Sequence, residues 1–176
     1  MPEAAGVPDC ISLDVHRDDR HLVERVFRWA LFAGLAAVAI AGLANLFGQK
    51  TVVSVATGDD ATLSLTAPPA LRSGLYFQGR FEIEAGSDLR EPTLVLDQGW
   101  FDAITVNTVQ PEPTSVAGEG DRVSFAYDPL PAGRTLTVYV ELQVNPTTFG
   151  RRRQGVELRD GERSIAAIER SVTVFP

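Results

Sequence analysis

The chain has 176 residues, of which 44% are hydrophobic and 22% are charged, and its formal net charge is −7. A surface that binds duplex nucleic acid must present Lys and Arg to the phosphates, so this acidic balance argues against a nucleic-acid-binding protein. Cys10 is the only cysteine, which excludes a disulfide within one chain.

An uncharged apolar stretch runs from Trp29 to Phe47. At helical rise these residues cover about 28 Å, close to the ~30 Å hydrocarbon core of a bilayer. The stretch therefore predicts one membrane-spanning helix, which we place at 26–48, after a short cytoplasmic head at 1–25 and before an extracytoplasmic domain at 49–176. We expect a single-pass membrane protein.

The orientation follows from the basic residues beside the apolar stretch. On the far side, Lys50 is the only basic residue before Arg72, whereas the near side has four arginines: Arg17, Arg20, Arg25 and Arg28. The flank richer in Lys and Arg stays in the cytoplasm, so we expect the C-terminal domain outside the cell membrane.

A signal peptide cleaved after Ala41 is the alternative, because small residues stand at Ala39 and Ala41. The head is long and acidic for such a peptide, and apolar residues continue to Phe47. These features favour a retained signal anchor.

The apolar stretch also contains a ridge of small side chains that ends in an amide. Its members recur every four residues: Ala33, Ala37, Ala41 and Asn45. In lipid, small residues let two helices approach closely, and a buried amide can form a hydrogen bond between them. The ridge is therefore a candidate contact with a partner helix. The alternative is an Ala-rich helix that serves only as an anchor.

After the helix, the hydrophobic period changes from 3.6 residues to two. Strict alternation from Leu75 to Ala85 and from Leu136 to Val144 predicts two half-buried strands. Shorter candidate strands are 51–56, 61–67, 93–96, 103–109, 123–128, 155–159 and 164–175. Asp160-Gly161 predicts a tight hairpin. Eight or nine strands without a helical pattern predict an all-β, immunoglobulin-like antiparallel β-sandwich.

The segment Leu130-Pro131-Ala132-Gly133, followed by the strand TLTVYVELQVNP, resembles bacterial extracytoplasmic immunoglobulin-like modules of the cell-adhesion and CARDB-like kind. In those modules an apolar residue and a turn glycine precede a long strand. The resemblance implies a binding, spacing or scaffolding role, and it transfers no catalytic residue.

The domain lacks several reactive residue types. From Thr51 to Pro176 there is no His, Cys, Met or Lys. This removes the usual base of a Ser-His-Asp triad, the Cys and Lys nucleophiles, and the common ligands of zinc and copper. We therefore expect no enzyme activity, no cofactor and no metal site.

Carboxylates are the one reactive class left. Asp97 and Asp102 flank a turn-like segment with Trp100 and Phe101. A glycosidase would need two such acids across a cleft, and Trp100 and Phe101 are candidate ligand-binding aromatics. The alternative is that a β-sandwich buries its Trp. Calcium on acidic loops is a further alternative, with candidate oxygen ligands from Asp59, Asp60, Asp102, Glu119 and Asp121.

Three consecutive arginines, Arg151, Arg152 and Arg153, stand where the strand pattern predicts a loop. Their guanidinium groups could bind carboxylates or phosphates of a polymer, or an acidic face of another protein. The alternative is a solvated hairpin loop. Taken together, these features predict a non-enzymatic, membrane-anchored accessory or interaction protein. A ligand-binding or wall-polymer-binding module is the first alternative, and a carboxylate-dependent hydrolase is the second.

Overall fold

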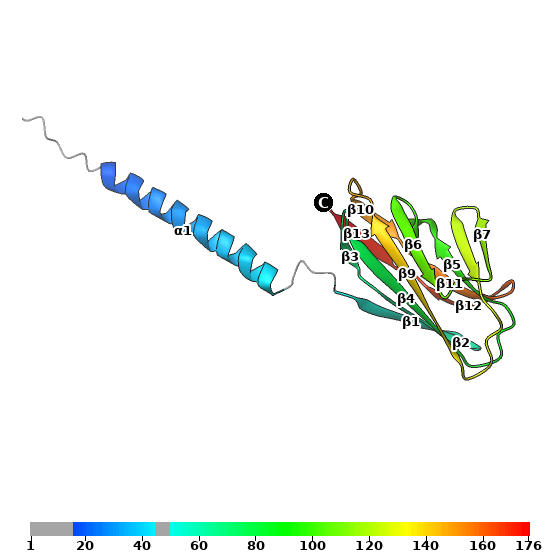
Figure 1. Ribbon diagram of the computed structural model, residues 1–176. Coiled ribbons are helices and arrows are strands. Elements are labelled where there is room, and N and C mark those ends of the chain that lie inside the picture. Colours follow the sequence, from blue (N-terminus) through cyan, green and yellow to red (C-terminus); the bar gives the residue numbers. More distant parts are fainter. Residues whose placement is uncertain (1–15, 45–49) are drawn as a thin grey trace, which may run out of the picture. The chain divides into compact units, whose positions relative to one another are not determined.

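The computed structural model describes residues 16–44 and 50–176, and the chain divides into two units, Met1–Gly48 and Gln49–Pro176 (Figure 1). The first unit contains helix α1 (His16–Leu43). The helix begins ten residues before the predicted start at 26, because Arg and Glu favour helices almost as strongly as apolar residues do. Asn45, the last member of the predicted ridge, lies outside the described residues.

Within α1, the segment Leu22–Leu43 is long and apolar enough to cross a membrane, with a mean hydropathy of 1.9, and none of its most apolar window is buried. Its large apolar side chains are exposed, from Leu22 at 55% to Leu43 at 89%. A signal sequence near an N-terminus can meet the same criteria of length and composition.

The second unit is all-β. Its strands are β1 (Val52–Thr57), β2 (Ala61–Ala67), β3 (Ala70–Arg72), β4 (Tyr76–Ala85), β5 (Pro92–Asp97), β6 (Ile104–Gln110), β7 (Ser115–Glu119), β8 (Arg122–Ala126), β9 (Thr135–Val144), β10 (Gly150–Arg153), β11 (Val156–Asp160), β12 (Arg163–Ile168) and β13 (Ser171–Phe175). A short 3-10 helix, η1 (Gln98–Trp100), follows β5.

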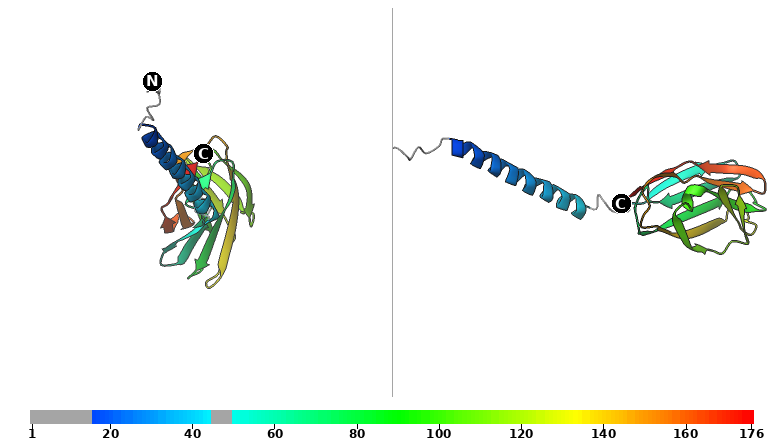
Figure 2. Two further views of the ribbon diagram at one scale, coloured as in Figure 1. Left: turned by 90° about the vertical axis from the view of Figure 1, so that its left-hand side faces the viewer. Right: turned by 90° about the horizontal axis from the view of Figure 1, so that it is seen from above.

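Two five-stranded antiparallel sheets form the layers of a β-sandwich (Figure 2). Their strand orders are β1-β2-β4-β9-β6 and β12-β11-β5-β8-β7. A third sheet, β10-β13-β3, contains the parallel pair β3–β13. The predicted all-β sandwich is confirmed.

Alternating burial explains the core between the layers. In β4, Phe81 and Ile83 are fully buried while the residues between them face outward, and in β2 the same holds for Leu63 and Leu65. Each side chain of this size contributes roughly 1.5–3 kcal/mol when it leaves water. The period of two therefore positions the apolar faces of both strands in one core.

The sequence pattern missed three strands and merged two others. β7 is exposed at every residue, and β10 is the charged sequence GRRR, so neither shows apolar alternation. β3 has only three residues. The predicted strand 164–175 is divided at Glu169 and Arg170 into β12 and β13, which belong to different sheets. The hairpin at Asp160-Gly161 is confirmed, because Gly161 has a φ of 60° between the antiparallel strands β11 and β12.

Candidate functional site

A groove of about 500 Å³ lies beside η1, where β5 ends and β10 and β11 meet. It brings together the predicted arginine cluster and both predicted carboxylates, although these are some fifty residues apart in the chain. The side chains that carry its charges are Asp97, Asp102, Asp121, Arg122, Arg151, Arg152, Arg153, Glu157 and Glu169.

Asp97 joins two strands at the floor of the groove. Its Oδ2 accepts a hydrogen bond from the backbone N–H of Gly155 over 3.0 Å, and its own N–H donates to the carbonyl of Gly155 over 3.1 Å. Its Oδ1 accepts from Nε of Arg122 over 3.3 Å. This carboxylate therefore holds the ends of β5, β8 and β11 together.

The turn η1 packs directly on the backbone at the end of β10. A Cβ atom on Gly99 would stand 1.7 Å from the carbonyl oxygen of Arg153, so only glycine fits there. Gln154 is fully buried, and its Nε2 lies 3.5 Å from the carbonyl oxygen of Gly99. The floor of the groove is thus backbone packed against backbone.

Of the two aromatic candidates, Trp100 is buried and Phe101 is half-buried. Trp100 is only 1% exposed, packs on Phe81 with ring centroids 5.4 Å apart, and donates from Nε1 to the carbonyl of Gly155 over 3.2 Å. Phe101 is half-buried against Phe125. A ligand in the groove cannot stack on the ring of Trp100, because the core already covers it, so the alternative of a buried core Trp describes this residue.

Arg170 closes the core beside Trp100. Its guanidinium carbon lies 5.7 Å from the centroid of the indole ring, and its Nη2 donates to the carbonyl of Pro68 over 2.6 Å. Burial lowers the pKa of Arg170. The cation is thus part of the packing between the sheets, and the residue was not among the sequence candidates.

The three arginines form strand β10, so the predicted loop at this position is wrong. β10 pairs with β13, with Arg151 opposite Thr173 and Arg153 opposite Ser171. Charged residues gave no strand pattern, and the pairing is made by the backbone. Because successive side chains of a strand point to opposite sides, the three guanidinium groups have different partners.

Two of these arginines are neutralised and one is not. Arg152 pairs with Asp102, and Arg153 pairs with Glu169 over 3.1 Å. Arg151 donates from Nε to the hydroxyl of Ser171 over 2.8 Å. Among the described residues, Arg151 has no carboxylate partner, so it is the cation of β10 that an anionic ligand could reach.

A second ion network borders the groove and was missed by the sequence analysis. Both Arg122 and Arg159 donate to Oε2 of Glu157 over 2.9 Å, and Arg159 also pairs with Glu119 over 2.9 Å. The hydrogen bond from Arg159, supported by Ser164 and Arg122, lowers the pKa of Glu157 to about 2. No sequence signal marks these residues, because their strands must pair before the charges meet.

Three of the five acidic residues considered for calcium, Asp60, Asp102 and Glu119, belong to separate ion pairs. Asp60 accepts from the hydroxyl of Ser87 over 2.7 Å and pairs with Arg163 over 2.5 Å, while Glu119 is paired as described above. In the described part of the chain, no group of three or more His, Cys, Asp or Glu side chains could hold a metal ion.

The members of the small-residue ridge that the structure describes lie on α1. Ala33 and Ala37 are exposed, and Ala41 is of intermediate exposure. Their spacing places them on one face of the helix, and the ridge stays a predicted contact with a partner helix.

No known family model matches the chain, and no curated protein matches it. Among solved structures, it is similar to a cohesin module from a Clostridium perfringens family 33 glycoside hydrolase, with 11% identity and a TM-score of 0.43 over 69% of this chain and 97% of that one. A non-cellulosomal cohesin from Archaeoglobus fulgidus has 15% identity and a TM-score of 0.37 over 72% and 92%. A Niemann-Pick type C2 protein from the Japanese carpenter ant has 9% identity and a TM-score of 0.41 over 70% and 96%. These low similarities add nothing to what the strands of the chain establish.

Proposed function

We propose that this protein is a non-enzymatic interaction module, anchored by one membrane-spanning helix and presenting its β-sandwich on the extracytoplasmic side. The observation that carries the proposal is the apolar surface of Leu22–Leu43, of which none of the most apolar window is buried. An exposed apolar surface of this length is unfavourable in water and favourable in a bilayer. The β-sandwich needs no part of it, because its core is made from residues 61–174.

The pairing of the groove carboxylates supports a non-enzymatic role. Asp97 is engaged by Gly155 and Arg122, and Asp102 is engaged by Arg152. A pair of catalytic acids must be free to exchange a proton with a substrate. Here the same groups hold strands together, which is a structural use of the carboxylates.

The extracytoplasmic placement rests on the arginines that precede the helix. The kinship with bacterial extracytoplasmic immunoglobulin-like modules rests on the turn at 130–133 and the strand that follows it. The extracytoplasmic placement and this resemblance are parts of the proposal. The proposal also includes a protein partner that binds the helix or the β-sandwich.

The single native cysteine provides the test of topology. In intact cells expressing the chain, a membrane-impermeant maleimide should fail to label Cys10 and should label it after permeabilisation. The matched variant replaces Cys10 by Ser and places Cys at Gly118, where a side chain meets open space, and it should be labelled without permeabilisation. Loss of Cys10 from the mature chain would show cleavage of a signal peptide, and the reverse labelling pattern would refute the proposed orientation.

The unneutralised Arg151 favours one second candidate, an anionic ligand held in the groove. Isothermal titration of the detergent-solubilised chain with an anionic polysaccharide should then give binding that Arg151→Gln removes. Arg153→Gln is the matched control, because Arg153 is already paired with Glu169. Equal binding by both variants would exclude the groove as the site.

A further inference from the structure

The exposed apolar side chains of the β-sandwich are concentrated at one end. Of the nine large hydrophobic residues that are exposed in the domain, six lie at this end and three lie elsewhere. The six are Val52 (49% exposed), Val53 (61%), Leu75 (44%), Tyr76 (65%), Phe149 (74%) and Phe175 (53%). We call this end the apolar tip.

Strand pairing brings the segments of the apolar tip together. Phe175 stands opposite Arg72 in the β3–β13 pair, and Gly150 stands opposite Val174, which positions Phe149 next to Phe175. The carbonyl of Phe175 accepts from the N–H of Ser73 over 2.8 Å.

Two further contacts bring Leu75 and the start of β1 to the same end of the domain. Leu75 accepts from the N–H of Val144 over 3.0 Å, and β1 begins at Val52 opposite Ala67, just before Pro68 and β3. The tip is therefore made of residues 50–53, 68–76, 145–151 and 172–176, and the C-terminus of the chain lies there (Figure 1).

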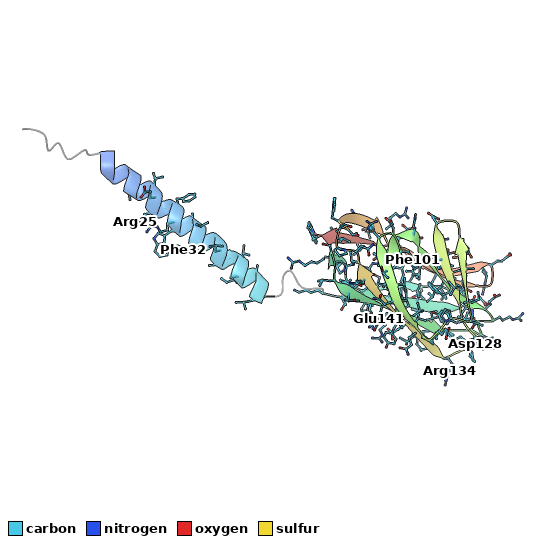
Figure 3. All side chains as sticks on the ribbon, turned by 45° about the horizontal axis from the view of Figure 1, so that its top comes forward. Arg25, Phe32, Phe101, Asp128, Arg134 and Glu141 are labelled. Atoms are coloured by element: carbon cyan, nitrogen blue, oxygen red, sulfur yellow. The ribbon has the colours of Figure 1, made fainter. Side chains whose placement is uncertain are left out.

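The four segments of the tip differ in charge from the turns at the opposite end of the domain. The four segments of the tip contain Lys50, Arg72 and Arg151 and no acidic residue. The turns at the opposite end, 57–61, 85–92, 127–134 and 160–163, contain seven acidic and three basic residues. Figure 3 labels two of them, Asp128 and Arg134.

Backbone hydrogen bonds link those opposite turns into one end. Gly86 donates to Asp60 over 2.8 Å, Ala85 to Arg134 over 3.0 Å, and Gly161 to Glu91 over 3.2 Å. The opposite turns therefore form one acidic end. The apolar tip borders the groove through Arg151, and there Asp102 and Glu169 are paired with Arg152 and Arg153.

The chain itself indicates what meets the apolar tip. Only six peptide units join Ala44, next to the end of α1, to Lys50 in the tip, and an extended chain of that length reaches at most about 22 Å. If α1 spans a membrane, as proposed above, the tip is therefore tethered close to the lipid surface. The acidic end, at the opposite end of the domain, is not tethered in this way.

The amino-acid composition of the tip also suits a position at the lipid surface. Aromatic side chains favour the boundary between head groups and acyl chains, and basic residues are attracted to anionic head groups by about 1 kcal/mol each. We propose that the apolar tip is a lipid-binding surface that seats the β-sandwich on the bilayer interface. This inference rests on the proposed membrane anchoring.

The test uses the full chain, with Cys10 replaced by Ser, reconstituted into vesicles of phosphatidylcholine and phosphatidylglycerol. A single cysteine at position 149 carries an environment-sensitive fluorophore, and lipids with a nitroxide near the head group act as quenchers. Phe149→Cys should show a blue-shifted emission and strong quenching. Val116→Cys, on exposed β7, is the matched control and should show neither.

A third labelled position distinguishes a failure of the lipid-binding surface from a failure of the membrane anchor. A fluorophore at Leu35→Cys in α1 should be quenched by nitroxides deep in the acyl chains if the helix spans the bilayer. Quenching at position 35 with a water-like spectrum at position 149 would overturn the lipid-binding surface and leave the anchor intact. No quenching at position 35 would overturn the anchor. A blue-shifted emission at position 149 that appears only after a membrane-protein extract is added would identify the tip as a protein-binding surface. That result would also overturn the proposal.

The basic residues provide a second measurement. Arg72 and Arg151 are exposed, so their replacement by Gln leaves the core unchanged. The double variant should reduce quenching at position 149 in anionic vesicles, and high salt should reduce it in the unsubstituted chain. If neither change affects the quenching, the contribution of charge to the proposal is wrong.

Discussion

Gly155 donates its backbone N–H to Oδ2 of Asp97 over 3.0 Å, and a Cβ atom at position 155 would stand 2.3 Å from the same oxygen. The hydrogen bond and the close approach have one cause, because the backbone can reach the carboxylate only where no side chain intervenes. Two residues 58 positions apart in the chain therefore fix the junction of β5 and β11.

The first prediction concerns this junction. Gly155→Ala should lower the free energy of unfolding by about 1–3 kcal/mol, because the added methyl group displaces the Asp97 carboxylate from its partly buried partners. Gly118→Ala is the control, since nothing lies within 4 Å of the added atom, and it should change stability by less than about 0.5 kcal/mol. Urea unfolding of the detergent-solubilised chain, followed by circular dichroism, measures both. Equal effects of the two substitutions would contradict the role of the junction.

The second prediction concerns acid stability. The pKa of Glu157 falls from 4.5 to about 2, chiefly through the hydrogen bond from Arg159, with Ser164 and Arg122 contributing. Because the pKa is lower in the folded state, the stabilisation is fully present above about pH 4.5 and is lost as the pH falls towards about 2. Urea midpoints should decrease through this window in the unsubstituted chain. Glu157→Gln should be less stable at pH 7 and should lose less stability on acidification; parallel curves for the two proteins would refute this.

The third prediction concerns backbone strain at Ala103, whose φ is 54°. The left-handed region costs a non-glycine residue about 1–2 kcal/mol, and glycine loses about 0.4–1 kcal/mol through its freer unfolded chain. Ala103→Gly should therefore raise the free energy of unfolding by about 0.5–1 kcal/mol. Ala126→Gly, at a position in β8 without positive φ, should lower it by about 0.5–1 kcal/mol. A loss of stability in both variants would show that the conformation at 103 is not strained.

The fourth prediction concerns the ridge on α1. Ala37→Leu and Ala41→Leu should weaken association with a partner helix in a membrane two-hybrid assay, because they add bulk where two backbones approach. Ala39→Leu is the control, since position 39 lies about 200° around the helix from position 37. If all three variants associate like the unsubstituted chain, the helix serves only as an anchor, and any partner binds the β-sandwich.

Several features could be predicted because their causes are local. An uncharged stretch from Trp29 to Phe47 is sufficient to indicate a long apolar helix, since each residue contributes independently to its hydropathy. Alternation over Leu75 to Ala85 indicates a strand because successive side chains point to opposite faces. Asp160-Gly161 indicates a hairpin because glycine accepts the positive φ that the turn requires.

The candidate site could be predicted only as separate pieces. The sequence marked Asp97, Asp102 and the arginines 151–153 as reactive groups, but it gave no reason for them to share one groove. It also marked Trp100 as a candidate aromatic platform, and tertiary packing covers that ring with Phe81 and Arg170. Burial of a single side chain depends on which strands face each other, which composition does not encode.

What the sequence determined by itself was therefore the presence of one long apolar helix, an all-β domain and the residue types available for chemistry. Tertiary structure decided that GRRR is strand β10, that Asp97 meets Gly155, and that six exposed apolar side chains gather at the end where the domain begins. Alternation reveals which face of a strand is buried, but the partner strand and the register depend on contacts between residues far apart in the chain. Only the folded β-sandwich brings those residues together.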